Sequence, residues 1–473
     1  MECSTCSPDK ATNRIYLNAT LAYCPHCNKV EDARITATEN GVFMERMCSQ
    51  TGVSSTKIAA DYKWYLERVM NRPMTVSDIP KPNPQKYGCP FDCGLCENHT
   101  GGLQLPVFSI TNDCNLDCPK CFTYNRADKR YYKTIEETEK IIDNILFTSK
   151  VQLINITGGE PTLHPELEKI LDTCRKKGIE RITMNTNGLL IASKPELAKM
   201  IKEKNVQVVL SMDALTAENS KMIFGADIVS QKLKTLEILE HLQIPTTILC
   251  VAIKDINEND IAQICNTYIT KSFVRSIVIQ NMTYTGKNGK DFEPGHYITI
   301  DEVENKLCTG DKFKQSDFFA LGSYHPLCYS VAYYIVNDDI TISLTDIISK
   351  NTLESISYGK YYLETNSDFY KEFSDGINRL WAEGASTKVI NALKSALNKL
   401  YPKDRELSVA ERNKISEQMV KMVYIHPHMD HNNFDINRVS TCGDLVPDEN
   451  GQMIPACSYN LLYRQKDARF WVE

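Results

Sequence analysis

The sequence lacks the features that would place the protein in a membrane, on nucleic acid or outside the cell. No apolar run approaches the roughly 20 residues that a helix needs to span a bilayer. Basic residues (54) and acidic residues (60) nearly balance, and no basic run is present. We therefore expect neither a nucleic-acid groove nor a transmembrane segment, although peripheral contact with a membrane stays open. The N-terminus has neither the basic nor the apolar region of a signal peptide.

Cysteine, by contrast, is abundant. The chain has 18 cysteines in 473 residues. Without an export signal they indicate a reducing compartment, where thiols bind metals rather than form disulfides. The length leaves room for two or three domains and a sizeable core. The composition therefore predicts a cytoplasmic metalloprotein of several domains.

Three cysteines on one short loop stand at the centre of the chain. A strand is predicted at 105–111, and Cys114, Cys118 and Cys121 follow it with Cys-x3-Cys-x2-Cys spacing. Three thiolates cannot complete a tetrahedral zinc site. They can hold three irons of a [4Fe–4S] cluster and leave the fourth iron open. An open iron at the end of a strand can bind and reduce a ligand.

Strand and helix patterns alternate from residue 105 onward. Strands are predicted at 105–111, 152–157, 181–185, 206–212, 246–253 and 275–280. Helices are predicted between them at 135–149, 165–177, 195–203, 228–242 and 258–270. Such alternation predicts βαβ units and a parallel sheet. In barrels of this kind the chemistry lies at the carboxyl ends of the strands.

Polar motifs follow three of these strands. They are Gly158-Gly159-Glu160-Pro161, Asn185-Thr186-Asn187-Gly188 and Ser211-Met212-Asp213. Glycines without a Cβ let a ligand approach the backbone closely, and a carboxylate such as Glu160 can pair with an ammonium group. Each motif alone would be an ordinary turn or strand end.

In this order, the cysteine loop and the three motifs resemble the signature of the radical S-adenosylmethionine (SAM) superfamily. The resemblance implies a partial (β/α)6 TIM-type barrel with a [4Fe–4S] cluster on the Cys114 loop. It also implies SAM contacts from Gly158, Gly159, Glu160, Asn187, Ser211 and Asp213. The position before the third cysteine is often aromatic in this superfamily and packs on adenine, but here it is Lys120. We expect Phe122 to make that contact instead.

Two Cys-x2-Cys pairs open the chain, Cys3 with Cys6 and Cys24 with Cys27. They supply the four thiolates of one tetrahedral site for zinc or iron, as in a zinc ribbon or rubredoxin. Segments 34–38 and 42–46 read as the hairpin that carries such knuckles. Cys48 is a fifth thiol that can replace Cys3 or Cys6, so the choice of four stays open.

A second triad, Cys89, Cys93 and Cys96, repeats the spacing of the first after a proline-rich linker. It follows no predicted strand, so we assign the SAM cluster to Cys114, Cys118 and Cys121. The second triad is predicted to hold an auxiliary [4Fe–4S] cluster, with structural zinc as the alternative. We expect Cys328 as its fourth ligand and His99 as the next candidate.

The region 301–473 loses the alternating pattern. Long helices are predicted at 369–383, 386–400 and 409–422. Cys442 and Cys457 are also expected to bind metal, but they need a partner such as Cys308 or a thiol from another region. The cluster of His426, His428 and His431 is read either as a metal site or as hydrogen-bonding histidines near iron.

The cysteine and histidine motifs at 89–99, 325–329 and 426–460 narrow the resemblance to the class D radical SAM methyltransferases, a group that includes tetraether lipid synthases and an enzyme assigned to pterin methylation. The resemblance implies four parts: a Cys-knuckle module (1–75), a linker with the second triad (76–104), a radical SAM barrel (105–300) and a mainly helical, substrate-capping region (301–473). No catalytic side chain is singled out.

The resemblance implies two functions, and a third of a different class stays open. The main expectation is a radical SAM enzyme that forms a C–C bond at an unactivated sp3 carbon of a lipid-like substrate. The alternative is radical methylation of a small heterocycle such as a pterin. A non-catalytic iron–sulfur or zinc scaffold that binds nucleic acid is the second alternative. The enzyme would need SAM, its cluster, at least one auxiliary cluster and an electron donor of the flavodoxin or ferredoxin type.

Overall fold

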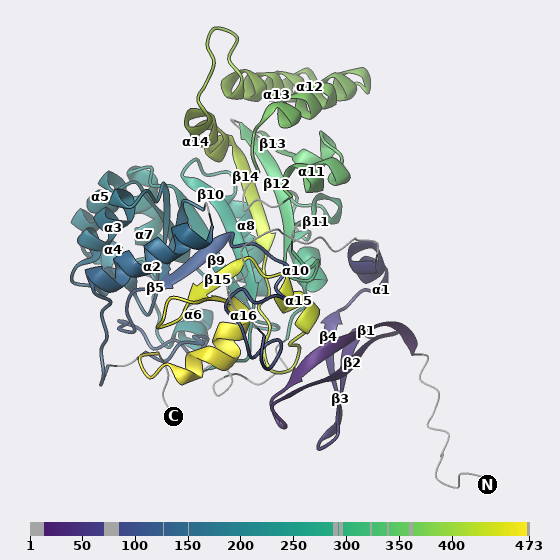
Figure 1. Ribbon diagram of the computed structural model, residues 1–473. Helices are drawn as coiled ribbons and strands as arrows, with labels where there is room; N and C mark the ends of the chain where they lie inside the picture. The colour runs from purple at the N-terminus through teal and green to yellow at the C-terminus, as the bar shows by residue number, and fades with distance from the viewer. Residues whose placement is uncertain are drawn as a thin grey trace.

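The computed structural model describes residues 14–70, 85–125, 127–149, 151–286, 292, 297–321, 324–337, 340–358 and 363–470. Two sheets organise this part of the chain, one of four strands and one of 12. In Figure 1 the small sheet lies at the lower right and the helical pair α12 and α13 at the top, with the large sheet between them. Among the described residues, no helix is both long and apolar enough to cross a membrane.

The small sheet is an antiparallel meander of β1 (Ile15–Cys24), β2 (Lys29–Thr38), β3 (Gly41–Cys48) and β4 (Gly52–Ala59). The hairpin predicted around 34–46 is therefore present as β2 and β3. Small and aliphatic side chains such as Ala33, Ile35 and Val42 form its core. The sheet also contacts the C-terminal region, because the Thr20 hydroxyl donates to Asp435 over 2.8 Å.

Six parallel strands form the centre of the large sheet, in chain order. They are β5 (Leu105–Ser109), β6 (Leu153–Thr157), β7 (Arg181–Thr186), β8 (Val206–Ser211), β9 (Thr246–Ala252) and β10 (Val274–Asn281). The main connecting helices are α2 (Ile135–Thr148), α3 (Leu167–Lys176), α5 (Pro195–Glu203), α7 (Val229–His241) and α8 (Glu258–Tyr268). Each matches a predicted element, so the partial (β/α)6 barrel is confirmed.

The C-terminal region extends the sheet at both edges. Beyond β10 come β14 (Val420–Ile425), which is parallel to it, and the antiparallel β12 (Ser330–Asn337). Beyond β5 come β15 (Asp444–Pro447) and β16 (Met453–Pro455). The sheet is completed by two short strands that pair with β12, β11 (Phe319–Ala320) and β13 (Ile340–Ser343).

Helices still dominate the middle of this region, as predicted. They are α10 (Ile300–Leu307), α11 (Lys350–Ile356), α12 (Ser367–Ala382), α13 (Thr387–Leu400) and α14 (Val409–Met419). Phe369, Phe373 and Leu393 pack with the β12 side chains in a second core. The region expected to be mainly helical therefore combines long helices with strands that build the barrel wall.

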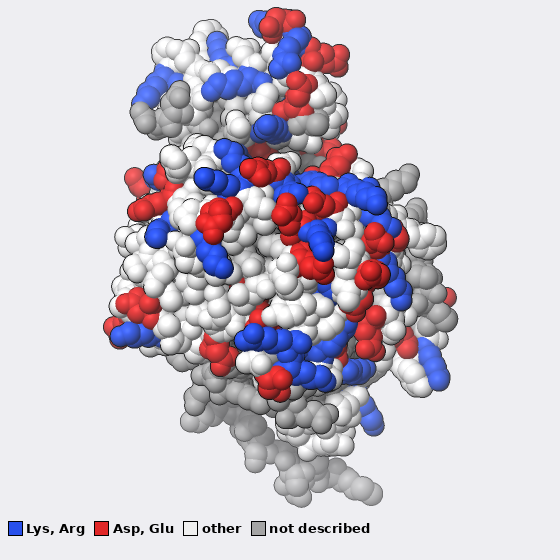
Figure 2. Space-filling model, turned by 90° about the vertical axis from the view of Figure 1, so that its left-hand side faces the viewer, with Lys and Arg blue, Asp and Glu red and all other residues white. Residues whose placement is uncertain are grey.

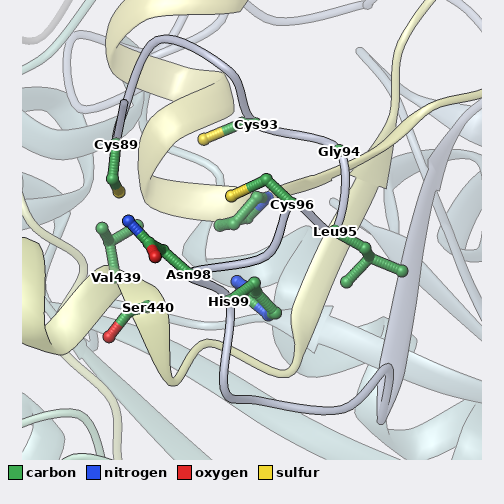
Figure 3. A pocket seen from close by; sticks show the side chains of 10 residues that line it. Cys89, Cys93, Gly94, Leu95, Cys96, Asn98, His99, Val439 and Ser440 are labelled. Carbon is green, nitrogen blue, oxygen red and sulfur yellow. The ribbon is translucent and has the colours of Figure 1, made fainter. Parts of the chain in front are cut away.

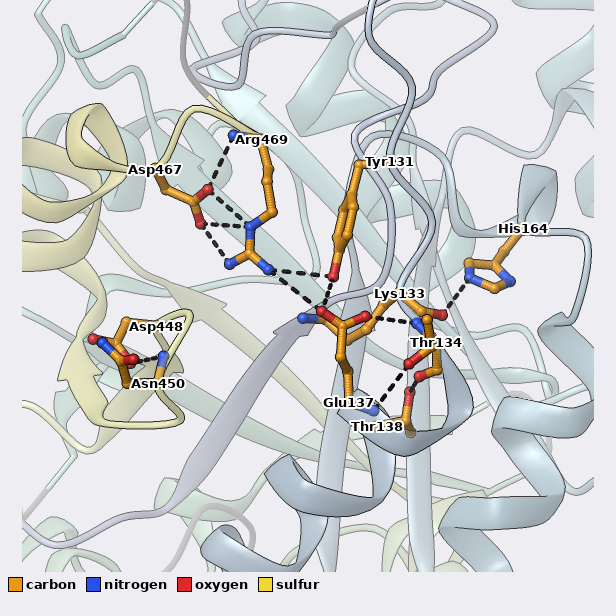
Figure 4. A network of polar contacts seen from close by, with 10 residues as sticks. All are labelled: Tyr131, Lys133, Thr134, Glu137, Thr138, His164, Asp448, Asn450, Asp467 and Arg469. Atoms are coloured by element: carbon orange, nitrogen blue, oxygen red, sulfur yellow. Dashed lines mark hydrogen bonds and ion pairs between the residues drawn. The ribbon is translucent and has the colours of Figure 1, made fainter.

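The end of the described chain docks beside the cysteine loop. Figure 4 shows Arg469 between Asp467 and Tyr131, with Nη2 of Arg469 at 2.7 Å from Asp467 and Nη1 at 3.2 Å from the Tyr131 hydroxyl. The Asn112 amide, just before Cys114, donates to the Arg469 carbonyl over 2.5 Å. The C-terminal segment is thereby fixed against the neck of the cysteine loop.

Candidate functional site

A cavity of about 340 Å³ lies inside the barrel and is lined by all six central strands, β14 and the cysteine loop. The cysteine triad of the loop lines this cavity. Most of the other residues predicted to contact SAM line it too, namely Phe122, Gly158, Gly159, Glu160, Asn187 and Ser211. The structure therefore brings together, around one cavity, motifs that are far apart in the sequence.

The two glycines after β6 pack against the cysteine loop itself. A Cβ on Gly158 would lie 2.4 Å from the Thr111 carbonyl oxygen, and one on Gly159 would lie 2.2 Å from that of Asp113. The Gly159 N–H donates to Thr111 and the Glu160 N–H to Asp113, each over 2.7 Å. The missing Cβ atoms thus admit the backbone of the loop, whereas the sequence argument had a ligand approaching there.

The carboxylate of Glu160 is buried and held by its neighbours. Its Oε1 accepts hydrogen bonds from the hydroxyls of Thr162 and Thr186 over 2.5 and 2.7 Å. Its Oε2 accepts the Asn187 N–H over 2.7 Å. A carboxylate oxygen can accept two bonds, so Oε2 has capacity for a donor such as a ligand ammonium group.

Asp213 lies behind the cavity wall in an ion pair with Lys120. Asp213 is fully buried and its Oδ1 also accepts the Val251 N–H over 2.5 Å. The Lys120 ammonium lies 4.7 Å from the centre of the Phe224 ring. A lysine–carboxylate pair therefore occupies the place where the superfamily resemblance leads one to expect an aromatic side chain.

Lys232 is a functional candidate that the sequence argument missed. It is 1% exposed, and its ammonium donates to the carbonyls of Asn187 and Ser211 and to the Ser211 hydroxyl over 2.6 to 2.9 Å. Burial lowers the pKa of Lys232 to about 8. The sequence did contain a sign of this burial: in the predicted helix 228–242, Lys232 lies on the apolar face together with Leu236 and Leu239.

The thiols of the cysteine loop are half-buried. Burial raises the pKa of Cys114 to about 12 and that of Cys118 to about 11. Without a metal these groups stay protonated at neutral pH, and a bound metal would deprotonate them.

Phe122, which follows Cys121, also lines the cavity. The guanidinium of Arg464 lies 5.3 Å from the centre of its ring.

The second triad surrounds a small separate pocket, shown in Figure 3. Cys89, Cys93 and Cys96 line it with His99 and Ser440. The Nε2 atom of His99 lies 2.8 Å from the Cys442 carbonyl oxygen. Three thiols on one loop suit a cluster with one site left for another ligand.

Cys328, the expected fourth ligand of that triad, lines a different pocket. That pocket also holds Cys442, Cys457, His426 and His428. The Cys457 sulfur lies 3.7 Å from Nδ1 of His428. Burial raises the pKa of Cys457 to about 12. The structure therefore groups Cys328 with the two late cysteines, whereas Cys308, suggested as their partner, caps α10 elsewhere.

The histidines divide between two places. His426 stacks on Tyr329 with ring centres 4.1 Å apart, and both His426 and His428 line the main cavity as well as the Cys328 pocket. His431 instead lies beside the small sheet, where its carbonyl accepts a hydrogen bond from Arg46 over 2.8 Å. The His426 cluster is therefore not a single metal site.

A fourth group of thiols lies on the small sheet. The sulfur atoms of Cys24, Cys27 and Cys48 all lie within 4.8 Å of one another. Hydrogen bonds from Thr51 and the Gln50 backbone lower the pKa of Cys48 to about 6, which favours the thiolate that a metal requires. Cys48 therefore belongs to this metal site, while Cys3 and Cys6 lie outside the described residues.

Comparisons with known families agree with this geometry. Residues 108–268 match the radical SAM superfamily, and residues 16–60 match the HMPTM N-terminal zinc ribbon domain. These stretches correspond to the first five barrel strands with their helices and to the small sheet.

Individual relatives extend the likeness. The chain is 24% identical over 482 aligned positions to the 7,8-dihydro-6-hydroxymethylpterin dimethyltransferase of Methanocaldococcus jannaschii, which covers 94% of each chain. It is 30% identical over 154 residues to a probable GTP 3′,8-cyclase of Pyrococcus abyssi, which covers 32% of this chain and 49% of the relative. Among solved structures, Streptococcus suis SuiB bound to S-adenosylmethionine matches 45% of this chain and 48% of its own at 19% identity, with a TM-score of 0.37.

The cysteine loop and the glycine motif occur in the order expected of the superfamily, and the barrel places both at one cavity. The family matches agree with this arrangement. Residues 108–268 form a radical SAM domain, and residues 16–60 form an N-terminal zinc ribbon of the HMPTM type.

Proposed function

We propose that the chain is a radical SAM C-methyltransferase that acts on a reduced pterin or a similarly small heterocycle. The likeness to the Methanocaldococcus jannaschii pterin dimethyltransferase extends over 94% of both chains. This favours the alternative reading of the sequence over the main one, C–C coupling of lipid-like chains. A non-catalytic scaffold is not favoured, because the chain is a radical SAM enzyme.

The observation that carries the proposal is a set of polar side chains inside the barrel, within a lining that is mostly apolar. Amide and hydroxyl side chains line the cavity from five consecutive strands: Asn155, Thr183, Asn185, Gln207, Thr247, Ser276 and Gln280. Apolar side chains share the lining, as in most small-molecule sites. The volume of about 340 Å³ also falls in the range of sites for compact ligands.

One of these amides is poised for a ligand. The Oδ1 atom of Asn185 is buried and has no hydrogen-bond partner among the described residues. A buried acceptor without a donor is costly, and a heterocycle with N–H groups, such as a pterin, would satisfy it. A saturated lipid chain would leave it unsatisfied.

We propose that Cys114, Cys118 and Cys121 hold the SAM cluster, with Glu160 binding the methionyl ammonium and Lys232 fixing the ends of the strands at Asn187 and Ser211, which line the site. When bound, the cluster and SAM would supply the 5′-deoxyadenosyl radical chemistry that activates a substrate C–H bond. The cavity walls of the barrel hold the substrate and keep water from the reacting atoms. An external donor of the flavodoxin or ferredoxin type would deliver the electron.

Two of the three other thiol groups are proposed as auxiliary [4Fe–4S] sites. One consists of Cys89, Cys93 and Cys96, and the other of the three cysteines that share the Cys328 pocket. The second pocket shares His426 and His428 with the main cavity. A cluster in that pocket would therefore be next to the substrate.

The surface gives no support to nucleic-acid binding on the face shown in Figure 2. There Asp and Glu side chains lie beside the Lys and Arg side chains across the face. The whole sequence likewise has six more acidic than basic residues, with a formal charge of −6. Backbone phosphates call for clustered positive charge.

Deuterium transfer tests the proposed function. The reconstituted enzyme, reductant and SAM are incubated with 6-hydroxymethyl-dihydropterin carrying deuterium on its sp3 carbons. We expect deuterium in the 5′-deoxyadenosine, because the abstracted hydrogen comes from the substrate. A perdeuterated isoprenoid lipid in detergent is the control. Transfer from the lipid and not from the pterin would reverse the assignment.

A further inference from the structure

Arg464 is a buried cation at the main cavity that the proposed SAM contacts leave unused. It is the first residue of the short helical turn η7 (Arg464–Lys466), which follows η6 (Tyr459–Tyr463), and it is 6% exposed. Its guanidinium lies 4.9 Å from the centre of the Tyr459 ring and 5.3 Å from that of Phe122. Both Arg464 and its neighbour Asn460 line the cavity.

The hydrogen bonds of Arg464 are few for a buried guanidinium. Nε and Nη2 donate to one acceptor, Oδ1 of Asn460, over 3.3 and 2.8 Å. In the part of the chain that is described, no carboxylate lies within ion-pair distance of it, whereas Arg469 nearby pairs with Asp467. A guanidinium has five N–H donors, and burying it without an anion is strongly unfavourable.

The charges around the cavity point to an anion from outside the chain. Asp213 is neutralised by Lys120 on the β8 side. Lys232 does not line the cavity, and its three N–H groups already donate to Asn187 and Ser211. Arg464 lies instead on the C-terminal segment, against Phe122. It is thus the cation that remains for a second ligand.

We propose that Arg464, oriented by Asn460, binds a carboxylate or phosphoryl group carried by the substrate. This rests on the proposed function, and it specifies that the heterocycle is bound as an anionic derivative. Planar guanidinium groups suit both anions because two N–H groups donate in parallel to two oxygens. The rings of Phe122 and Tyr459 hold the guanidinium plane in place. The side chain therefore loses little further freedom when an anion binds.

The first test uses inorganic phosphate and needs no pterin. Melting temperatures of the cluster-loaded chain are compared in phosphate and in chloride at equal ionic strength. We expect phosphate to raise the value by roughly 1–3 °C when present at ten times its Kd. The shift should vanish in Arg464→Gln and persist in part in Arg464→Lys. Arg412→Gln is the matched control, because Arg412 is also stacked on a tyrosine, at 5.0 Å from Tyr401, outside the cavity.

The second test identifies the carrier of the anion. Binding of 6-carboxypterin, 6-hydroxymethylpterin and its phosphate ester is followed by pterin fluorescence with SAM present. We expect the anionic pterins to bind at least about ten-fold more tightly than the neutral one. Arg464→Gln should weaken only the anionic pterins, by roughly 10- to 100-fold, and Arg412→Gln should weaken none.

Three results would overturn the proposal. The first is equal binding of neutral and anionic pterins by the wild type, which would show that the substrate needs no anionic group. Deuterium transfer from the neutral pterin would in that case still support the proposed function. A loss of SAM affinity in Arg464→Gln with pterin binding unchanged would assign the anion to SAM. A changed midpoint potential of the SAM cluster with all ligand affinities unchanged would make Arg464 a counter-charge for the cluster.

Discussion

The Glu160 carboxylate and the Asn187 backbone N–H are joined by a hydrogen bond of 2.7 Å. This bond ties the loop after β6 to the end of β7, across 27 positions of sequence. The backbone of Glu160 is at the same time bound to Asp113 at the neck of the cysteine loop. One residue therefore sets the relative positions of three motifs, and it does so through its backbone as well as its carboxylate.

Glu160→Gln should weaken both folding and SAM binding. The carboxylate now accepts hydrogen bonds from its neighbours, and the amide of Gln would point an N–H₂ donor at some of the same donors. The loss of these bonds costs about 1–3 kcal/mol of unfolding free energy. We also expect SAM affinity to fall by more than about ten-fold, because the ammonium loses a charged partner. Denaturant unfolding and equilibrium dialysis measure the two effects. Glu168→Gln, at an exposed ion pair with Lys204, should change neither. An unchanged SAM affinity would reduce Glu160 to a structural tie.

Lys421 should make the stability of the fold depend on alkaline pH. It is 1% exposed on β14 and donates to backbone carbonyls that include Val274 on β10. Burial, with Arg275 nearby, lowers the pKa of Lys421 to about 7. The unfolded value is about 10.4, so between these values the native state binds fewer protons than the unfolded state. Stability therefore rises with pH across this window, by at most about 1.4 kcal/mol per unit.

Urea unfolding at about pH 7 and about pH 9 checks this sign. Lys421→Met should make the rise smaller and leave the part contributed by Lys232, whose pKa is also lowered, whereas Met at the exposed Lys414 should leave the rise unchanged. An equal change in stability between these two pH values in the wild type and in Lys421→Met would contradict the prediction. It would mean that the carbonyl acceptors keep the Lys421 ammonium charged.

The barrel could be predicted because its local patterns agree with the tertiary fold. Strands such as β8 (Val206–Ser211) alternate buried and half-buried residues, and helices such as α3 keep one apolar face. Strand β12 differs, since all eight of its residues are buried. A continuous apolar run cannot be distinguished from a buried helix by periodicity. Strands β15 and β16 have four and three residues, too few to show a period.

The site was predictable only where spacing is local. The cysteine loop and the motifs after β6, β7 and β8 line one cavity because parallel strands end at the same face. The grouping of Cys328 with Cys442 depends instead on how the C-terminal strands extend the sheet, which no spacing encodes. Lys232 and Arg464 were missed for a similar reason: a single basic residue shows its burial only in the folded chain.

Cys48→Ser should remove the metal of the small sheet as completely as Cys24→Ser does. The three thiols are mutually within 4.8 Å, so loss of either leaves an incomplete ligand set. We expect a loss of about one zinc or iron per chain, with iron–sulfur absorbance and SAM cleavage retained. Elemental analysis measures it, and Cys308→Ser is the control. Full metal content in Cys48→Ser would return the site to Cys3, Cys6, Cys24 and Cys27.

The cysteines of the C-terminal region provide the sharpest test of how the auxiliary sites are divided. Cys328 shares a pocket with Cys442 and Cys457, and Cys89 belongs to the other one. If each pocket holds its own [4Fe–4S] cluster, replacing one ligand by Ala removes about four irons from that pocket alone. Two replacements in the same pocket should then cost no more iron than one.

We therefore expect Cys328→Ala with Cys442→Ala to lose about four irons, and Cys328→Ala with Cys89→Ala to lose about eight. Iron and sulfide analysis of anaerobically reconstituted protein measures both, and Cys265→Ala, in the buried core of α8, controls for general damage. The opposite pattern would mean that Cys328 closes the cluster of Cys89, Cys93 and Cys96, as the sequence first suggests. The comparison remains decisive even if product formation is lost in every variant, because it depends on iron content and not on activity.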